Sequence, residues 1–500
     1  MKAVEMLGIR KIYPDGVVAL RGVDFEVEEG EIHGLLGENG AGKTTLMRIL
    51  YGEIHATDGE IKVFGRRVRF RSPRDAIRHG IAMIYQHFSL VPTMSVLDNL
   101  YLSMSAVNPG VSRDDTEERA EKLIAETGLR IPLGKTVEEL PVGVQQRVEI
   151  LKALIRDARI LILDEPTSVL TPLEVEELFT SLRRLRDKGI TIILITHKLR
   201  EAKAITDRVT VLRRGSKVGT VKTSEASEQQ LARMMVARDV ELVIEKPPSR
   251  GPGREVLRIE DIWVKGGEGV DALRGVSLVV REGEILGIAG VQGNGQTELC
   301  ETIAGLRKPY KGRILLDSRD VTWLDTKERY RLGIAYIPES RKIGLIHDMS
   351  VLENSILTSI DEYTGRLGIV NWKKAKEKAV EVIKEYGVQP PNPDTPVKFL
   401  SGGNQQKLMV GREIARKPRI LVVAEPTQGV DVASTEFIRK RLLELRNQGI
   451  GILLVSTDLD EIFQLSDRVA VMYEGRIMGE GRVEEFTPEK IGLLMGGVNA

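Results

Sequence analysis

Short apolar runs recur along the chain, and stretches that mix apolar with charged residues separate them. The runs at residues 160–163 (ILIL) and 192–195 (IILI) have the length and composition of strands buried on both faces, as in a parallel sheet. Residues 173–188, between these runs, have the pattern of a helix. Two further segments, residues 114–127 and 372–386, are charged, amphipathic and free of strand-like runs. The pattern predicts α/β domains, each with a small helical subdomain inserted in its core.

The chain repeats itself once. The segment ALRGV at residues 19–23 recurs at residues 272–276, an offset of 253, and EPT at residues 165–167 recurs at residues 425–427, an offset of 260. Residues 247–253 (PPSRGPG) cannot continue a helix and lack side chains for a core, so they are predicted to be a linker. We therefore expect a first domain at residues 1–246 and a second at residues 254–500.

The composition is that of an ordinary globular protein, with 42% apolar and 29% charged residues. A formal charge of +1 creates no overall field that would favour nucleic acid. One cysteine, Cys300, and six histidines give no disulfide and no zinc spacing. No apolar run approaches the roughly 18 residues that span a bilayer, and no secretory signal begins the sequence. We expect the chain to stay in the cytosol and not to cross a membrane.

A glycine-rich segment lies between a strand-like and a helix-like stretch. Residues 37–45 (GENGAGKTT) match the pattern GxxxxGK[ST], in which backbone N–H groups surround phosphates, the lysine reaches the β and γ phosphates and the threonine binds Mg²⁺. The residues expected to hold the nucleotide here are Gly37, Asn39, Gly40, Gly42, Lys43, Thr44 and Thr45.

Two carboxylates, Asp164 and Glu165, directly follow the apolar run at residues 160–163. The carboxyl edge of a parallel sheet is where α/β proteins bind ligands. Asp164 is expected to hold Mg²⁺ together with Thr44, and Glu165 is expected to polarise the attacking water.

In this order and spacing, the motifs resemble the ABC ATPase family from about residue 3 to residue 480. The resemblance makes Gln86 the Q-loop glutamine, which also reaches Mg²⁺, and His197 the switch histidine; both act in catalysis with Glu165. It also implies that Tyr13 stacks on adenine. The implied fold is two tandem P-loop ATPase domains, each with a RecA-like parallel sheet, a β subdomain and an inserted helical subdomain, and the implied cofactors are ATP and Mg²⁺.

Residues 400–407 (LSGGNQQK) resemble the signature motif of the same family. Ser401, Gly402 and Gly403 begin a helix whose N–H groups can bind a phosphate, and Gln405 belongs to the same set. In the family this motif serves the ATP that the other domain holds.

The second half lacks several of the groups found in the first. Gln296 stands at the position of the P-loop lysine. The other replacements are Ala424 for Asp164, Thr457 for His197 and Glu339 for Gln86. The residues expected at this degenerate site are Trp263, which we match to Tyr13, and Gly290, Gly293, Gly295, Gln296, Thr297, Glu298 and Glu425. We expect the site to bind nucleotide without efficient turnover.

The signature-like segment of the first half is also altered, because Pro141 and Val142 replace the serine and the first glycine. If the halves pair head to tail within one chain, all intact parts meet at one site and all altered parts meet at the other. Random loss would scatter the alterations over both sites. The sequence therefore predicts intramolecular pairing and one hydrolytic site per chain.

The resemblance implies that a separate membrane permease receives the ATP-driven motion at the cytoplasmic face of the membrane, and that an extracytoplasmic solute-binding protein takes part indirectly. Residues 293–298 (GNGQTE) and 140–146 (LPVGVQQ) are more similar to the nucleoside branch of bacterial sugar and nucleoside importers than to the ribose or xylose branch. We expect an ATPase subunit for import of nucleosides or simple sugars, with a monosaccharide such as ribose or xylose as the alternative.

A soluble twin-domain factor acting on ribosomes would have a long charged linker and two hydrolytic sites, and a DNA-repair ATPase would have zinc-binding cysteines.

Overall fold

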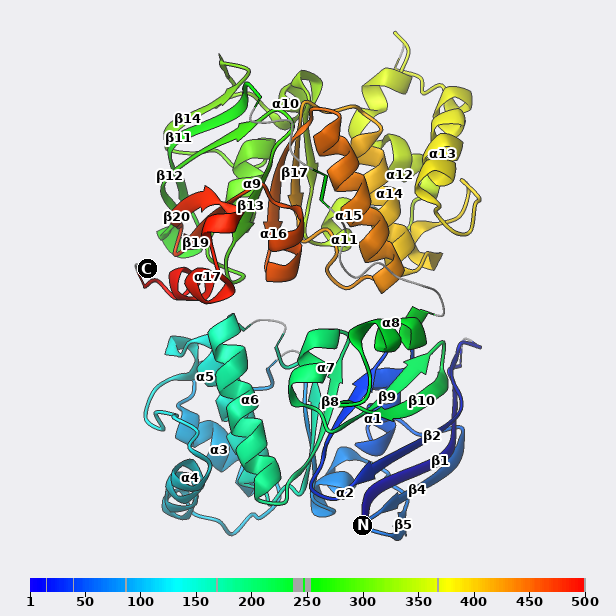
Figure 1. Ribbon diagram of the computed structural model, residues 1–500, viewed down its shortest axis with the longest axis vertical. Helices are drawn as coiled ribbons and strands as arrows, with labels where there is room; N and C mark the ends of the chain where they lie inside the picture. Colours follow the sequence, from blue (N-terminus) through cyan, green and yellow to red (C-terminus); the bar gives the residue numbers. More distant parts are fainter. Residues whose placement is uncertain are drawn as a thin grey trace. The chain divides into compact units, whose positions relative to one another are not determined.

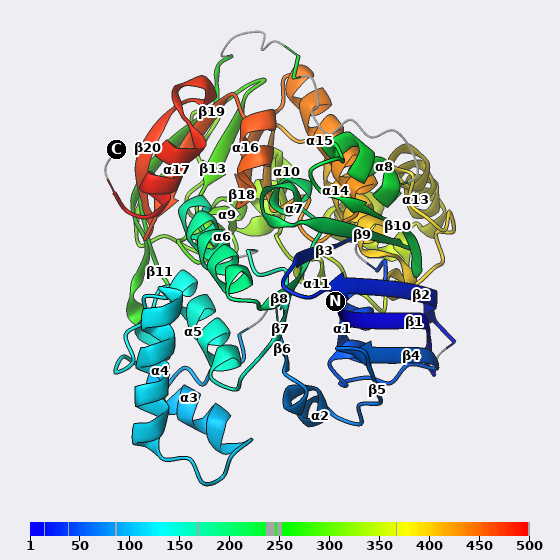
Figure 2. The same cartoon turned by 60° about the horizontal axis from the view of Figure 1, so that its bottom comes forward.

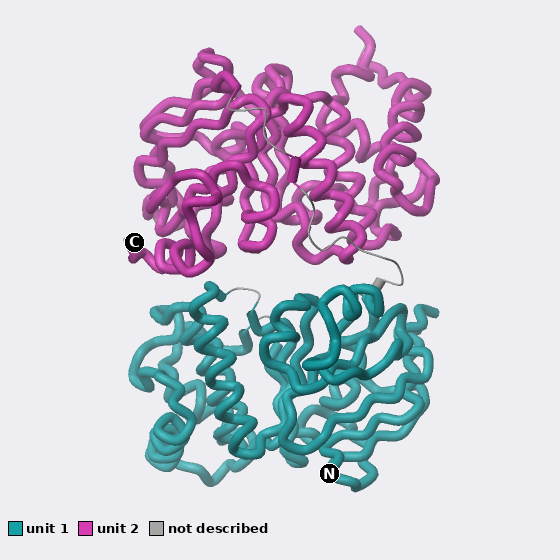
Figure 3. The backbone as a smooth tube through the Cα atoms, in the orientation of Figure 1, with its two compact units in different colours: residues 1–240 teal, residues 241–500 magenta. Residues whose placement is uncertain are grey.

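The computed structural model describes residues 1–14, 16–38, 40–85, 88–167, 170–236, 246–247, 253–366 and 368–498. It forms two compact units, Met1–Val240 and Glu241–Ala500 (Figure 3). Residues 248–252 of the predicted linker lie outside the described ranges, so the boundaries at 246 and 254 stay predictions. No helix in the described part of the chain is both long enough and apolar enough to cross a bilayer.

The first unit contains a four-stranded antiparallel sheet, in the order β2-β1-β4-β5, and a six-stranded, mainly parallel sheet, in the order β10-β9-β3-β8-β7-β6. Its strands are β1 (Lys2–Ile12), β2 (Val18–Glu28), β3 (Ile32–Leu36), β4 (Asp58–Val63), β5 (Arg66–Val68), β6 (Ile81–Ile84), β7 (Ile160–Asp164), β8 (Thr191–Thr196), β9 (Arg208–Arg213) and β10 (Ser216–Lys222). Its α-helices are α1 (Lys43–Leu50), α2 (Pro73–Arg78), α3 (Val96–Ser105), α4 (Arg113–Thr127), α5 (Val142–Leu154), α6 (Pro172–Asp187), α7 (Leu199–Ile205) and α8 (Glu228–Val236).

The second unit repeats both sheets, with the orders β12-β11-β14-β15 and β16-β17-β18-β13-β19-β20. Its strands are β11 (Glu255–Lys265), β12 (Asp271–Arg281), β13 (Ile285–Ala289), β14 (Lys311–Leu316), β15 (Arg319–Asp320), β16 (Ile334–Ile337), β17 (Ile420–Ala424), β18 (Gly451–Ser456), β19 (Arg468–Tyr473) and β20 (Arg476–Arg482). Its α-helices are α9 (Gln296–Ala304), α10 (Thr326–Leu332), α11 (Arg341–Gly344), α12 (Val351–Ile356), α13 (Trp372–Tyr386), α14 (Gly402–Ile414), α15 (Val432–Asn447), α16 (Leu459–Leu465) and α17 (Pro488–Met495).

The predicted elements are confirmed. The two apolar runs form β7 and β8, which pair in parallel, and every residue of both strands is buried. The two charged segments form α4 and α13. Helix α4 begins at Ser112, whose side chain accepts a hydrogen bond from the Asp115 N–H, and it ends at Gly128 in the left-handed conformation. With α3 and α5, α4 lies apart from the four-stranded sheet of the same unit (Figures 1 and 2).

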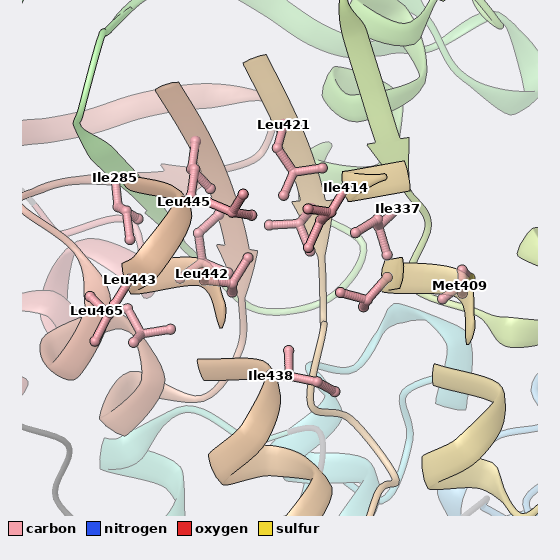
Figure 4. Packing of buried hydrophobic residues seen from close by; sticks show 14 of the residues in the cluster. Ile285, Ile337, Met409, Ile414, Leu421, Ile438, Leu442, Leu443, Leu445 and Leu465 are labelled. Carbon is pink, nitrogen blue, oxygen red and sulfur yellow. The ribbon is translucent and has the colours of Figure 1, made fainter. Parts of the chain in front are cut away.

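Alternate residues of the central strands enter different cores, because successive side chains of a strand point to opposite faces. In β7, Leu161 and Leu163 pack with residues of α5 and α6, whereas Ile160 and Ile162 pack with α1 and the four-stranded sheet. Figure 4 shows the equivalent packing in the second unit, where Leu421 of β17 faces apolar side chains of the helices. A sheet buried on both faces holds its strand ends rigidly, and those ends carry the site residues.

Candidate functional site

The loop between β3 and α1 has a backbone shape that only glycine allows at two positions. A Cβ atom on Gly37 would lie 2.4 Å from the Leu212 carbonyl oxygen. Gly42 has a φ of 100°, and a Cβ atom there would lie 2.9 Å from the Ala19 carbonyl oxygen. Gly40 also has a positive φ, of 78°. The N-terminal N–H groups of α1 therefore face a loop that can close around an anion.

Lys43 begins α1 and its ammonium group is buried in this loop. The Nζ atom donates hydrogen bonds to the carbonyl oxygens of Gly37 (2.7 Å) and Glu38 (3.0 Å). Burial lowers the pKa of Lys43, against the opposing effect of the carboxylates of Glu165 and Asp164. The loop thus holds a poorly solvated ammonium group. Because charges attract more strongly where water is excluded, this group would attract an anionic ligand strongly.

Asp164 ends β7, and its Oδ2 atom lies 3.3 Å from the Thr44 hydroxyl, which donates to it. Burial raises the pKa of Asp164, and the neighbouring Glu165 raises it further. A buried carboxylate and a hydroxyl are the oxygen ligands that Mg²⁺ prefers, usually together with substrate phosphates. The two side chains therefore fit the expected Mg²⁺ site.

Glu165 adopts a left-handed backbone conformation with a φ of 49°, which is uncommon for a residue with a side chain. Its Oε1 atom lies 2.8 Å from Nδ1 of His197, at the end of β8. Burial raises the pKa of Glu165, but the hydrogen bond and electrostatic effect of His197, together with the ammonium groups of Lys43 and Lys198, lower it by more, and the net shift is downward. Glu165 is thus an ionised carboxylate beside Lys43, able to accept a hydrogen bond from a water molecule.

A third carboxylate, that of Glu201, lies in no recognised sequence motif and binds the segment after Glu165. The Thr167 hydroxyl donates to Glu201 at 2.7 Å, and the Thr196 hydroxyl donates to the same carboxylate at 3.4 Å. In the second unit Glu461 accepts from Thr427 in the same way. The offset of 260 between the two glutamates could have identified them, because it is the offset of the neighbouring repeated motifs.

Four other residues are predicted for the first site. Tyr13 follows β1, with the Lys11 ammonium 5.2 Å from its ring centroid. Thr45 lies in the first turn of α1. Asn39 and Gln86 lie outside the described residues.

In the second unit the P-loop backbone is kept, with Gly293 and Gly295 at φ values of 91° and 105°. Gln296 replaces the lysine and bonds to its own loop: its Nε2 donates to the Val291 carbonyl (2.9 Å), and its Oε1 accepts from the Asn294 N–H (3.0 Å). A Cβ atom on Gly290 would lie 2.3 Å from that Nε2 atom. A neutral amide thus holds the shape of the loop without a positive charge. Glu298 lies in the first turn of α9.

Glu425 repeats the backbone of Glu165, with a φ of 47°, but not its electrostatic surroundings. Its Oε1 atom accepts a hydrogen bond from the Thr457 N–H at 2.7 Å. Burial, with a contribution from Glu461, raises the pKa of Glu425 to about 8. At neutral pH this carboxyl group is mostly protonated, unlike Glu165.

Helix α14 begins at Ser401, whose Oγ accepts a hydrogen bond from the Asn404 N–H at 3.4 Å. Gln405 donates to the carbonyl oxygens of Val397 and Leu400, both at 3.2 Å. Helix α5 of the first unit begins at Pro141, which has no side chain able to cap it.

The two signature glycines differ in their surroundings. A Cβ atom on Gly403 would lie 2.4 Å from an Asp431 carboxylate oxygen, and one on Gly143, its first-unit equivalent, 2.3 Å from a Glu174 oxygen. Packing therefore requires glycine at this position in both units. A Cβ atom on Gly402 would lie 3.6 Å from its nearest neighbour, an Arg341 side-chain nitrogen. A larger residue therefore fits, and the first unit has Val142 at the equivalent position. The small residue at Gly402 leaves space beside the start of α14.

The expected match of Trp263 with Tyr13 is wrong. Trp263 pairs with Arg274 across β11 and β12, whereas Arg10 pairs with Arg21 across β1 and β2. Because these pairs differ by the offset of 253, Trp263 corresponds to Arg10. The Trp263 ring lies near cations instead, with the Lys311 ammonium 5.3 Å from its centroid.

The chain belongs to the ABC transporter family, whose model matches residues 20–168 and 273–428. It is an ATPase of that family. The chain is 44% identical to the glucose import ATP-binding protein TsgD13 of Haloferax volcanii, over 99% of this chain and 96% of that protein. It is also 44% identical to the guanosine import ATP-binding protein NupO of Bacillus subtilis, over 99% and 97%. A solved complex of the archaeal ribosome recycling factor aABCE1 with the ribosomal stalk protein aP1 shares the fold, with a TM-score of 0.63, 22% identity and coverage of 96% and 90%.

The raised pKa of Glu425 gives a prediction for stability. The folded state binds a proton that the unfolded state releases between pH 4.5 and about 8, so the free energy of unfolding falls as pH rises through this range. Glu425→Gln removes the titrating group, so we expect it to stabilise the second unit at pH 8.5 by a few kcal/mol. At pH 5 it should change little. Calorimetric unfolding at both pH values measures the difference, and an equal effect at pH 5 and pH 8.5 would contradict the assignment.

Proposed function

We propose that this chain is the ATP-hydrolysing subunit of an importer for nucleosides or simple sugars, with one competent and one degenerate nucleotide site. The observation that carries the proposal is the cluster in the first unit of a buried Lys43 ammonium, the Asp164 carboxylate beside Thr44, and the Glu165–His197 pair. The second unit keeps the backbone of this cluster without its lysine and without its strand-end aspartate.

The residues of the first unit have separate roles in this proposal. Lys43 and the loop N–H groups bind the β and γ phosphates. Thr44, Asp164 and Gln86 hold Mg²⁺, which neutralises charge on the phosphates when it is bound. Glu165 accepts a hydrogen bond from the attacking water, and His197 keeps its carboxylate ionised and oriented.

The intact signature of the second unit completes the competent site if the two halves pair head to tail. This part of the proposal rests on the sequence. In a head-to-tail pairing, the altered P-loop of the second half and the altered signature of the first half share one site, and the intact parts share the other. The capped start of α14 and the open space at Gly402 support phosphate binding there. Glu425 belongs to the other site.

A separate permease in the membrane would receive the motion, which places the chain at the cytoplasmic face. A cavity of about 210 Å³ in the first unit, whose walls include Tyr85 and Ser89, is a candidate contact for that permease. Glu149 in its wall accepts from the Ser89 N–H at 2.6 Å and pairs with Lys152 at 2.8 Å.

The solute class rests on the relatives and on short segments. The two relatives import glucose and guanosine by name, at equal identity to this chain. Residues 293–298 and 140–146 favour a nucleoside. A role on ribosomes has weaker support, because the solved ribosome recycling factor shares only the fold.

The first test compares two matched glutamates. Glu165→Gln should lower steady-state ATP turnover by about 100-fold or more, because it removes the carboxylate that orients water. Glu425→Gln should keep more than about half of the turnover, because its site lacks the lysine and the aspartate. Phosphate release from the purified subunit, with its permease if turnover requires it, measures both. Equal losses would contradict the one-site proposal.

A second pair of variants tests the signature. Ser401→Arg places a bulky side chain at the start of α14 and should abolish turnover, whereas Pro141→Arg makes the same change at the altered signature and should have little effect. The measurement is again phosphate release, with circular dichroism to check folding. Full turnover by the Ser401 variant would show that the halves do not pair as proposed.

The import role is tested by what the chain binds in its host. After gentle solubilisation of membranes, the tagged chain should co-purify with polytopic membrane proteins. The ATPase of that complex, with its solute-binding protein, should then respond more strongly to nucleosides than to glucose, ribose or xylose. Recovery of ribosomal components without any membrane protein would contradict the import role and leave the ATP site intact.

A further inference from the structure

A hydroxyl meets a carboxylate in both units, but the carboxylate comes from different strands. In the first unit the Thr44 hydroxyl lies 3.3 Å from Asp164, which ends β7. In the second unit the equivalent hydroxyl, of Thr297, donates to an Oε atom of Glu339 at the same distance, 3.3 Å. The residue that ends β17, at the position of Asp164, is Ala424.

The geometry of the parallel sheet explains how Glu339 takes this place. Strands β16 and β17 are neighbours in parallel register, from Ile334↔Ile420 to Ile337↔Val423, so both end at the same edge. Neighbouring strands lie about 4.8 Å apart. Glu339 follows β16 by two residues, and its side chain is one methylene longer than that of aspartate. It can therefore reach the hydroxyl that an aspartate on β17 would otherwise face.

The P-loop of the second unit offers an anion little compensating charge. Gln296 bonds to Val291 and Asn294 within the loop and carries no charge, whereas Lys43 supplies an ammonium group in the first unit. The added carboxylate of Glu339 repels a bare triphosphate. A divalent cation held by the Glu339 carboxylate would offset this repulsion.

We propose that the second unit binds a nucleoside triphosphate only together with Mg²⁺, and that Glu339 and Thr297 are the side chains that hold the cation. Carboxylate and hydroxyl oxygens fit Mg²⁺, which is commonly bound by one or two carboxylates plus substrate phosphates. The inference rests on the ATP-binding part of the proposed function and is independent of the transported solute. The degenerate site would then bind nucleotide only with a cation. Its carboxylate ligand would be Glu339, after β16, because β17 ends at Ala424 and offers none.

The experiment labels the full-length chain on ice with a photoreactive azido-ATP and assigns the label to each unit by peptide mass spectrometry. Titrations of the azido-ATP, in Mg²⁺ and in EDTA, give its half-saturating concentration for each unit. In the parent chain, labelling of the second unit should require Mg²⁺. Glu339→Ala should weaken labelling of the second unit by about 10-fold or more in Mg²⁺. In EDTA it should not weaken labelling, because a repelling carboxylate is gone.

Matched variants separate the cation from a structural effect. Glu339→Gln keeps the size of the side chain and an oxygen ligand of the kind proposed for Gln86 in the first unit, so it should weaken labelling in Mg²⁺ less than Glu339→Ala. Glu301→Gln removes a negative charge from helix α9, the helix that carries Thr297. Glu301 pairs with Arg307, and this variant should leave labelling unchanged. Gln296→Lys restores an ammonium group and should make labelling of the second unit less dependent on Mg²⁺.

Three outcomes would overturn the proposal, and they differ from one another. Label on the first unit alone in the parent chain would show that the second unit holds no nucleotide. Equal labelling of the second unit of the parent chain in Mg²⁺ and in EDTA, or unchanged labelling of Glu339→Ala in Mg²⁺, would show that Glu339 holds no cation there. An absence of label on both units would contradict the ATP-binding function itself.

Discussion

Lys43 places an ammonium group in a buried position at the carboxyl edge of a parallel sheet, where the carboxylates of Asp164 and Glu165 lie nearby. Removing a charge from water is costly unless opposite charge compensates it. Loop carbonyls and two carboxylates supply part of that compensation, and the loop glycines make room for it. The chemistry of the first unit depends on this balance of buried charges.

The second unit shows what happens when the balance changes and the backbone does not. Its P-loop glycines and the left-handed Glu425 repeat the conformations of the first unit. Without a lysine, the Gln296 amide holds the loop, and without a histidine, the buried Glu425 carboxyl group has a raised pKa. The same fold thus supports an ionised carboxylate in one unit and a mostly protonated one in the other.

Packing and ligand binding constrain the signature glycines differently. Gly403 and Gly143 are both glycine because an acidic side chain lies where a Cβ atom would be. Gly402 has no such neighbour, and the first unit has Val142 in its place. A glycine that internal packing does not require, in the unit with the capped helix, is consistent with the approach of a phosphate.

The sequence by itself determined the repeat, the parallel strands at residues 160–163 and 192–195, the helical insertions and the P-loop, because each depends on local composition or on spacing along the chain. The offset of 253 also places Trp263 opposite Arg10, and the pairing of β11 with β12 agrees with it. Only the tertiary structure showed that Glu339 reaches Thr297, because the segment after β16 and the start of helix α9 meet there. The opposite pKa shifts of Glu165 and Glu425 were also decided by tertiary structure, since burial and the partner at the end of the neighbouring strand set them.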